Sequence, residues 1–203
     1  MFGRYSYNQT LRKMTIAFGQ IFNNIQIKRK DSSDNVIQTL KVPLAYAPKE
    51  KFLTRLDGQA SLNDREFAVT LPRMGFEITG LSYDGSRKLT RVQKYRTAKQ
   101  NIDGKVLNFN YTPVPYNINY SLYAFTATAE GGLQIVEQIV PFFQPDYTVT
   151  VNIIPDLDIK RDVPIVLNSI NYEDSYDGSF TTRRAVIYTM NFTAKTYLFG
   201  PDQ

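Results

Sequence analysis

The sequence predicts a single α+β domain, 1–203, in which a twisted, mainly antiparallel sheet of about six strands is flanked by two or three helices. Three observations predict this fold class. The chain has 203 residues, enough for one domain with a sizeable core. Its 42% hydrophobic and 21% charged content is ordinary for a folded domain. Segments that alternate apolar and polar residues outnumber segments with helical spacing, and polar turns separate them.

The N-terminal third is expected to contain a helix, a hairpin and a second, short helix. Apolar residues recur every three or four positions from Leu11 to Ile25, which predicts an amphipathic helix over about 8–23, with Asn8 as a candidate N-cap. The runs "IQIKRK" and "VIQTLKVPLAYA", separated by "DSSDN", predict a hairpin. Pro48 is suited to the first turn of a helix that ends near Gly58.

The middle of the chain predicts two strands separated by an arm. One strand is expected over about 69–83, with Met74, Phe76 and Ile78 on one side. The segment 84–105 has weak periodicity and many basic residues, and we interpret it as a projecting basic arm or an irregular loop. The stretch "YNINYSLYAF" alternates most clearly, so the side chains of Tyr116 and Ile118 should face away from that of Asn117.

A hydrophobic helix is predicted over 131–146, in the stretch "GGLQIVEQIVPFFQPD". Seven of its side chains are large and apolar: Leu133, Ile135, Val136, Ile139, Val140, Phe142 and Phe143. Because exposing all of them would be costly, we expect both broad faces of this helix to be covered, by the sheet and by another helix or a neighbouring subunit. Three further strands are expected in "YTVTVNIIP", "VPIVLNSINY" and "RRAVIYTMNFTAKTY".

The residue types argue against catalysis, metal binding and cofactor binding. The chain has no Cys and no His, which excludes thiolate nucleophiles, zinc-thiolate sites and the commonest general base. Carboxylates cluster at Asp156 and Asp158 and again at Glu173, Asp174 and Asp177, where a divalent-metal site or an acid/base pair is one interpretation. Neither cluster has the spacing of a calcium loop, and solvated turns between strands are the favoured interpretation. We therefore predict that the protein is not an enzyme.

Charge is distributed unevenly along the chain. Residues 1–105 contain 19 Lys and Arg against 9 Asp and Glu, whereas residues 106–203 contain 5 against 10. Such asymmetry fits nucleic-acid binding, or subunits that meet basic face to acidic face. The densest basic cluster, a candidate protein interface, is Arg87, Lys88, Arg91, Lys94, Arg96 and Lys99. A solvated surface stretch is the alternative for this cluster.

No signal or membrane-spanning segment is expected, so synthesis in a cytoplasm is predicted.

Several segments in one order resemble a known family. They are the N-terminal "MFG" and "FNNIQIKRK", then "VPLAYAPKEKF" and "LPRMGFEI", then "QIVEQIVPFFQPDYTVT", and finally "DVPIVLNSI" and "RRAVIYTMNFTAKTYLFGP". Together they resemble the tail sheath stabiliser, or tail completion, proteins of contractile-tailed T-even-type bacteriophages. The arm at 84–105 is the part that matches least, and some family members continue beyond the position of "FGPDQ" into a long polar tail.

The resemblance implies a structural role in the virion. Proteins of this family form a hexameric ring at the head-proximal end of the tail, made in the bacterial host cytoplasm. The ring caps the tail tube and the last sheath ring, and it presents a surface to the neck proteins. Expected partners are further copies of the chain, the tail sheath protein, the tail tube or tube-terminator protein and the neck proteins. Genomic DNA would pass through the lumen without sequence-specific binding. The implied fold is that of a tail terminator, and the family supplies no catalytic residue.

Two alternatives come from other functional classes. A basic single-domain nucleic-acid-binding protein would also explain the net charge of +5 and the 14 tyrosines. A carboxylate-based hydrolase is a more distant alternative. Native mass separates the ring-forming tail protein from the nucleic-acid-binding protein, because a ring-forming protein oligomerises without a ligand. Affinity for DNA that falls linearly with the logarithm of salt concentration would favour the nucleic-acid-binding protein.

Overall fold

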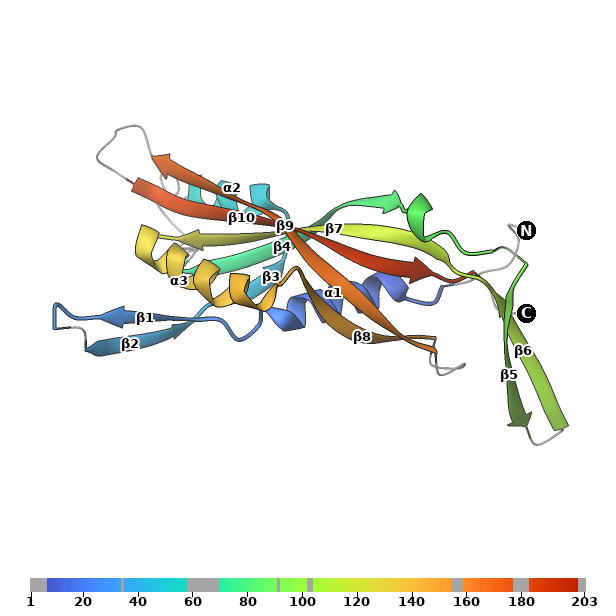
Figure 1. Ribbon diagram of the computed structural model, residues 1–203. Coiled ribbons are helices and arrows are strands. Elements are labelled where there is room, and N and C mark those ends of the chain that lie inside the picture. The colour runs from blue at the N-terminus through green and yellow to red at the C-terminus, as the bar shows by residue number, and fades with distance from the viewer. Residues whose placement is uncertain are drawn as a thin grey trace.

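The computed structural model describes residues 7–33, 35–57, 70–90, 92–101, 104–154, 159–176 and 183–200. It contains one large sheet, two separate hairpins and three α-helices (Figure 1). Of the residues singled out above, Gly58, Arg91, Asp156, Asp158 and Asp177 lie outside the described ranges. The α+β fold class predicted from the sequence is confirmed.

The large sheet has six strands, as predicted. Its order is β3 (Leu44–Tyr46), β4 (Arg73–Tyr83), β7 (Val114–Thr126), β10 (Arg183–Leu198), β9 (Ile159–Tyr176) and β8 (Asp146–Ile154). Neighbouring strands are antiparallel except β3 and β4, which are parallel. The longest strands lie side by side next to the centre, where β10 pairs with both β7 and β9.

Strand β7 shows why alternation in the sequence was informative. Ile118, Tyr120 and Leu122 are fully buried on one face of the sheet. On the opposite face, Asn117 and Asn119 are partly exposed. The two-residue period places successive side chains on opposite faces, as predicted for this strand.

Helix α1 (Thr10–Ile21) packs on the face that Tyr120 occupies. Met14, Phe18 and Phe22 follow one another at four-residue spacing and are almost fully buried. The ring of Phe18 stacks on that of Tyr120, with centroids 4.3 Å apart. The expectation that Asn8 caps this helix is wrong, because the Asn8 amide donates to the carbonyl oxygen of Phe199 at 3.4 Å and Gln9 occupies the N-cap position.

Helix α3 (Ala129–Ile139) lies on the same side of the sheet as α1 (Figure 1). The hydroxyl of Thr128 caps it by accepting from the N–H of Gly131 at 3.3 Å. The helix is shorter than predicted: it gives way to a 3-10 turn, η3 (Val140–Phe142), because Pro141 has no N–H to continue the helical ladder.

The sides of α3 are covered unequally in the single chain. Ile135 and Ile139 are buried against the sheet, but Leu133 and Phe142 are 55% and 67% exposed. Within the described part of a single chain, no second layer covers these side chains, so of the two expected covers the neighbouring subunit stays a prediction. One face of α3 is buried against the sheet, and the side chain of Leu133 on its outward side is exposed in the single chain.

Helix α2 (Lys49–Asp57) covers one end of the opposite face of the sheet (Figure 1). Its Phe52 packs in a second, smaller core with Tyr123, Phe125 and Ile187. A Cβ atom added at Gly75 would lie 2.3 Å from the Phe52 ring, so only glycine at this position lets α2 approach β4 so closely.

Two hairpins lie apart from the sheet, near opposite ends of the molecule (Figure 1). The first, β1 (Gln26–Lys30) with β2 (Val36–Lys41), was predicted. The predicted second run of that hairpin is divided at Pro43, whose carbonyl oxygen accepts from Met74, so that β3 joins the large sheet instead.

The second hairpin, β5 (Lys94–Asn101) with β6 (Gly104–Tyr111), was not recognised as strand pairs from the sequence. The segment had been interpreted as an arm or an irregular loop, whereas its backbone forms an eight-pair antiparallel ladder.

Candidate protein-interaction surfaces

The described residues offer no arrangement for metal chemistry. Among them, no group of three or more Asp, Glu, His or Cys could hold a metal ion. Glu173 and Asp174 lie within β9 rather than in a turn; Glu173 pairs with Lys49 at 2.6 Å, and Asp174 accepts from the Tyr172 hydroxyl at 3.1 Å. No helix in the described ranges has the length and apolarity needed to span a bilayer.

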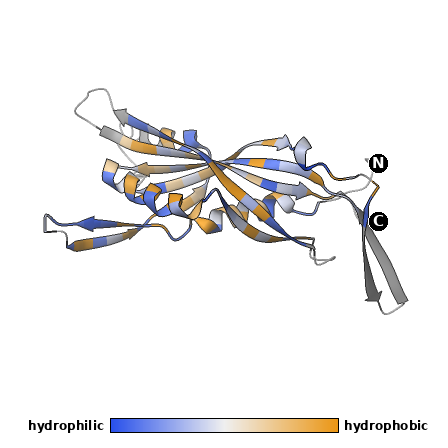
Figure 2. Cartoon of the chain, in the orientation of Figure 1, coloured by the Kyte–Doolittle hydropathy of each residue, from blue (hydrophilic) through white to orange (hydrophobic). Residues whose placement is uncertain are grey.

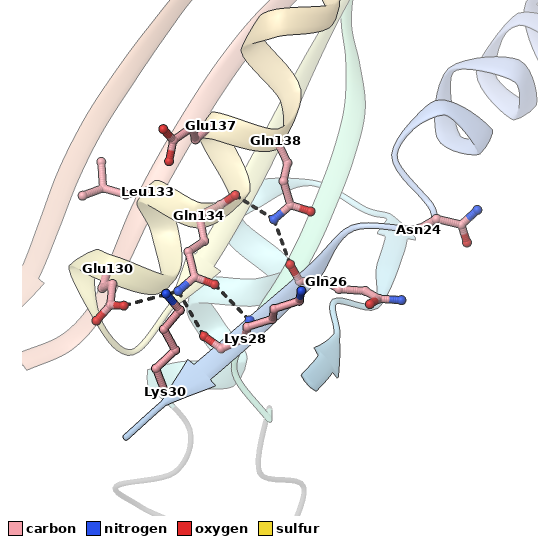
Figure 3. Close-up of a pocket in the computed structure, with 9 residues that line it drawn as sticks. All are labelled: Asn24, Gln26, Lys28, Lys30, Glu130, Leu133, Gln134, Glu137 and Gln138. Atoms are coloured by element: carbon pink, nitrogen blue, oxygen red, sulfur yellow. Dashed lines mark hydrogen bonds between the residues drawn. The ribbon is translucent and has the colours of Figure 1, made fainter. Parts of the chain in front are cut away.

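The first surface is the junction between α3 and β1, where two glutamine side chains bind a strand edge (Figure 3). The Gln134 amide accepts from the backbone N–H of Lys28 at 2.9 Å and donates to the carbonyl oxygen of Lys28 at 3.1 Å. The Gln138 amide donates to the carbonyl oxygen of Gln26 at 2.8 Å. These side chains take the place of a neighbouring strand, and we call them the glutamine clamp.

A groove of about 820 Å³ runs beside the glutamine clamp. Lys28 and Lys30 stand on its β1 side, and Glu130 and Glu137 stand on its α3 side (Figure 3). Leu133, which is 55% exposed, lies between the two glutamates. The groove therefore offers a small apolar surface bordered by charges of both signs, which is typical of the rim of a protein interface.

A second groove, of about 520 Å³, is mainly apolar and lies between the end of α1, η3 and the start of β8. Phe22 and Ile139 line it and are buried. Phe142 and Tyr147 also line it but are 67% and 38% exposed. Asn24, Glu137 and Gln138 line both grooves, so the two form one continuous depression.

The third surface lies at the base of the basic hairpin, the name used here for β5–β6. The Asp84 carboxylate accepts from the Ser86 hydroxyl at 2.5 Å and from Nε of Arg87 at 2.8 Å. Hydrogen bonds from the Ser86 side chain and then from Arg87 hold the pKa of Asp84 well below its usual range. The Arg87 guanidinium also donates to Oδ1 of Asn117 at 2.6 Å and lies over the Tyr197 ring, 5.1 Å from its centroid.

The structure therefore divides the predicted interface cations into two groups. Arg87 is bound within its own chain and is only 21% exposed. Lys88 and Lys94 are exposed, and Nζ of Lys94 lies 5.1 Å from the centroid of the Tyr111 ring. Arg96 and Lys99 belong to β5. The sequence grouped these residues by charge, but Arg87 serves to fix the hairpin base.

The face of the sheet beyond α2 carries a polar network. The Ser121 hydroxyl donates to Asn191 at 2.7 Å, and the Asn191 amide donates to the Ser169 hydroxyl at 3.0 Å. At its edge, the Tyr123 hydroxyl donates to Glu77 at 2.7 Å. Burial, with this bond to Glu77, raises the pKa of Tyr123 to about 12. These hydrogen bonds give the polar side chains on this face partners within the sheet.

The glutamine clamp was not found by sequence analysis. Gln134 and Gln138 lie between the apolar positions that predicted a hydrophobic helix, and no role was predicted for them. Their partners in β1 lie 106 and 112 residues away in sequence, and the contact depends on how the hairpin is placed against α3. Their four-residue spacing, which puts both amides on one face of a helix, was the only local signal available.

Comparison with known proteins gives consistent matches over nearly the whole chain. Residues 5–203 match a family described as the T4-like virus Myoviridae tail sheath stabiliser. The chain is 33% identical over 208 residues to the tail completion protein gp15 of Enterobacteria phage T4, covering 99% of this chain and 74% of that protein.

Proposed function

The chain belongs to the tail sheath stabiliser family of T4-like Myoviridae, and from that premise we propose that it forms a closed ring of six copies at the head-proximal end of the tail. The ring would cap the tube and the last sheath ring, hold the sheath extended and offer a surface to the neck proteins. Its partners would be the sheath protein, the tube or tube-terminator protein and the neck proteins. DNA would pass through the lumen without sequence-specific binding, and the site of action would be the virion tail.

One observation supports this proposal most strongly. A single chain leaves large apolar side chains of α3 and η3 exposed beside an apolar groove, and Phe142 is the most exposed of these. Exposed apolar side chains beside an apolar groove are typical of a contact with another protein. The two hairpins also extend from the body near opposite ends, which suits a subunit that contacts several neighbours (Figure 1).

The experiment that tests the stabilising role uses tails assembled without this protein. Extended sheath on a tube should dissociate or contract in the absence of the purified chain, and adding the chain should keep the sheath extended. Phe142→Ser should reduce this protection without unfolding the protein, because its side chain is largely exposed. Lys51→Ser, on the exposed side of α2, is the control substitution. Equal decay of the sheath with and without the chain would refute the stabilising role.

The basic hairpin is proposed to contact an acidic surface of a neighbouring subunit or of another tail or neck protein. Residues 94–101 and 104–111 contain four Lys and Arg and no Asp or Glu. Lys88→Ser combined with Lys94→Ser should weaken assembly, and wild-type assembly should itself weaken as salt rises above ~0.15 M, so that the two converge at high salt. Thermal stability should change little, because exposed charges contribute at most about 1 kcal/mol each. Arg87 is left unchanged since it binds Asp84. Normal assembly of this variant at every salt concentration would make the hairpin a solvated element only.

The nucleic-acid-binding alternative predicts a different outcome for the same cations. Binding to duplex or single-stranded DNA should then weaken linearly with the logarithm of salt concentration, and the Lys88 and Lys94 substitutions should make that slope shallower. We expect no such binding at moderate salt, because a protein that lines a DNA passage should not retain the DNA.

A further inference from the structure

Two strands at the edges of their sheets carry only one charged residue each, Lys41 at the end of β2 and Asp146 at the start of β8. In β2, residues 36–40 are uncharged, and Val36 and Ile37 are 51% and 69% exposed. In β8, residues 147–154 are uncharged and six of the eight are β-branched. Among the described strands, β2 pairs with β1 alone and β8 pairs with β9 alone. Figure 2 shows the contrast within the first hairpin, where β1 is mainly hydrophilic and β2 carries hydrophobic positions.

Open edges of this kind are usually protected in proteins that stay monomeric, because unpaired backbone groups accept strands from other chains. The other edge strands in the described ranges differ from these two in length or in sequence. Strand β3 has only three residues, and β5 and β6 carry Lys94, Arg96, Lys99 and Lys105. The edge of β2 lacks both devices over most of its length. The edge of β8 lacks them except near its end, where Nζ of Lys13 in α1 donates to the carbonyl oxygen of Ile153 at 2.8 Å.

The glutamine clamp determines which backbone groups of β2 face outward. Gln134 binds both the N–H and the carbonyl oxygen of Lys28, so these two groups point away from β2. Lys28 lies opposite Thr39 in the antiparallel register. In a pair of this type, the backbone groups of both residues point away from each other. The N–H and carbonyl oxygen of Thr39 therefore point to the open edge.

The clamp also keeps the edge of β2 away from the edge of β8 in the same chain. Because β1 is bound to α3 on its outer side, the hairpin is held at one end of the molecule, and β8 runs away from it towards the other end (Figure 1). The two open edges of one chain are therefore separated. They can meet only between copies, as a head-to-tail contact joins two different surfaces of neighbouring subunits.

We propose that β2 of one copy adds to the open edge of β8 in the next copy, so that the large sheet is continued across the subunit boundary. This inference rests on the proposed ring and identifies the surfaces that would close it. In a closed ring every β2 and every β8 edge is paired, and no unprotected edge of this kind is left.

The surroundings of the two edges fit this pairing. The hairpin carries exposed Lys28, Arg29, Lys30 and Lys41, whereas Asp146 and Asp162 lie beside the first half of β8. The apolar groove that contains Phe142 and Tyr147 adjoins the start of β8. Strand addition commonly combines backbone hydrogen bonds with pockets for alternate side chains, and this groove can receive the exposed Ile37 of the added strand.

Cross-linking tests the pairing directly, because the natural chain contains no Cys. Thr39→Cys is combined with Thr148→Cys in one variant and with Thr150→Cys in another, and the purified protein is treated with a short bis-maleimide. Thr39, Thr148 and Thr150 are all exposed. We expect a ladder of covalent oligomers from at least one double variant, covalent dimers from a mixture of the single variants, and monomer from each single variant alone. Thr54→Cys, on the exposed side of α2, replaces Thr39→Cys in the control and should give no ladder.

Ile37→Lys provides an independent measurement, since a charge on an open edge opposes strand addition. Its melting temperature should match that of the wild type, while the concentration needed for half-assembly should rise at least tenfold. Light scattering distinguishes the remaining outcomes. A ring that gives no ladder in either double variant overturns the pairing but leaves the proposed function intact. A monomer in solution and on tails overturns both. A third outcome is that Ile37→Lys still forms the ring but no longer completes tails. That result would assign the β2 edge to a contact with another tail protein and would overturn the pairing.

Discussion

Removing the Gln134 amide should loosen the first hairpin without affecting the core of the sheet. Gln134→Met keeps the length of the side chain and a similar helix propensity, but it loses both hydrogen bonds to Lys28. Each bond contributes about 0.5–1.5 kcal/mol net, and water can reach these groups, so we expect a combined loss of about 1–2 kcal/mol. Because 1.4 kcal/mol corresponds to about tenfold in an equilibrium constant, amide exchange in β1 and β2 should accelerate roughly 5- to 30-fold.

Native-state hydrogen exchange measures this effect segment by segment. The amides of β7 and β10 should exchange at the wild-type rate, because they report opening of the sheet core. Gln138→Met removes the single bond to Gln26 and should give a smaller acceleration. Glu137→Gln, on the same helix, is the control and should leave exchange in the hairpin unchanged. Unchanged exchange in Gln134→Met would refute the clamp, and equal acceleration in the core would show that the hairpin opens only with the whole domain.

Three further predictions concern the body of the domain. Gly75→Ala should lower the free energy of unfolding by about 1–3 kcal/mol, because its Cβ would overlap the Phe52 ring of α2. Gly80→Ala should be close to neutral, because the nearest atom to its Cβ would lie 3.8 Å away. Thermal unfolding of the two variants measures the difference. The lowered pKa of Asp84 contributes stability at neutral pH, so the difference in melting temperature between wild type and Asp84→Asn should be constant above about pH 5 and shrink below pH 3.8. Ile139→Asp should abolish soluble expression, since it buries an unpaired charge, whereas Leu133→Asp should express well because that position is 55% exposed.

Local patterns were sufficient to predict most elements of this fold. The alternation around Tyr120 identified the strand at the centre of the sheet, and the spacing of Met14, Phe18 and Phe22 identified α1. The break between β2 and β3 was missed because the run around Pro43 is apolar on both sides. The β5–β6 hairpin was missed because its charged and aromatic residues follow no clear period.

The interaction surfaces were harder to predict, because they depend on contacts between distant segments. Charge density identified the basic cluster between Arg87 and Lys99, but only the placement of Asp84 and Asn117 shows that Arg87 is engaged within the chain. The second face of α3 was predicted to be covered by another helix or by a neighbouring subunit, because the number of apolar residues does not say which of the two packs on it. The clamp at Gln134 depends on tertiary placement that no local pattern encodes.

The proposed ring is tested most directly by the native mass of the purified chain. Light scattering over a series of concentrations should give a mass near six times 23.3 kDa, either free at high concentration or in rings recovered from assembled tails. The mass of Ile37→Lys should fall towards that of a single chain at concentrations where the wild type is assembled. A wild-type protein that stays at 23.3 kDa in solution, and is present as separate single copies on finished tails, would contradict the ring.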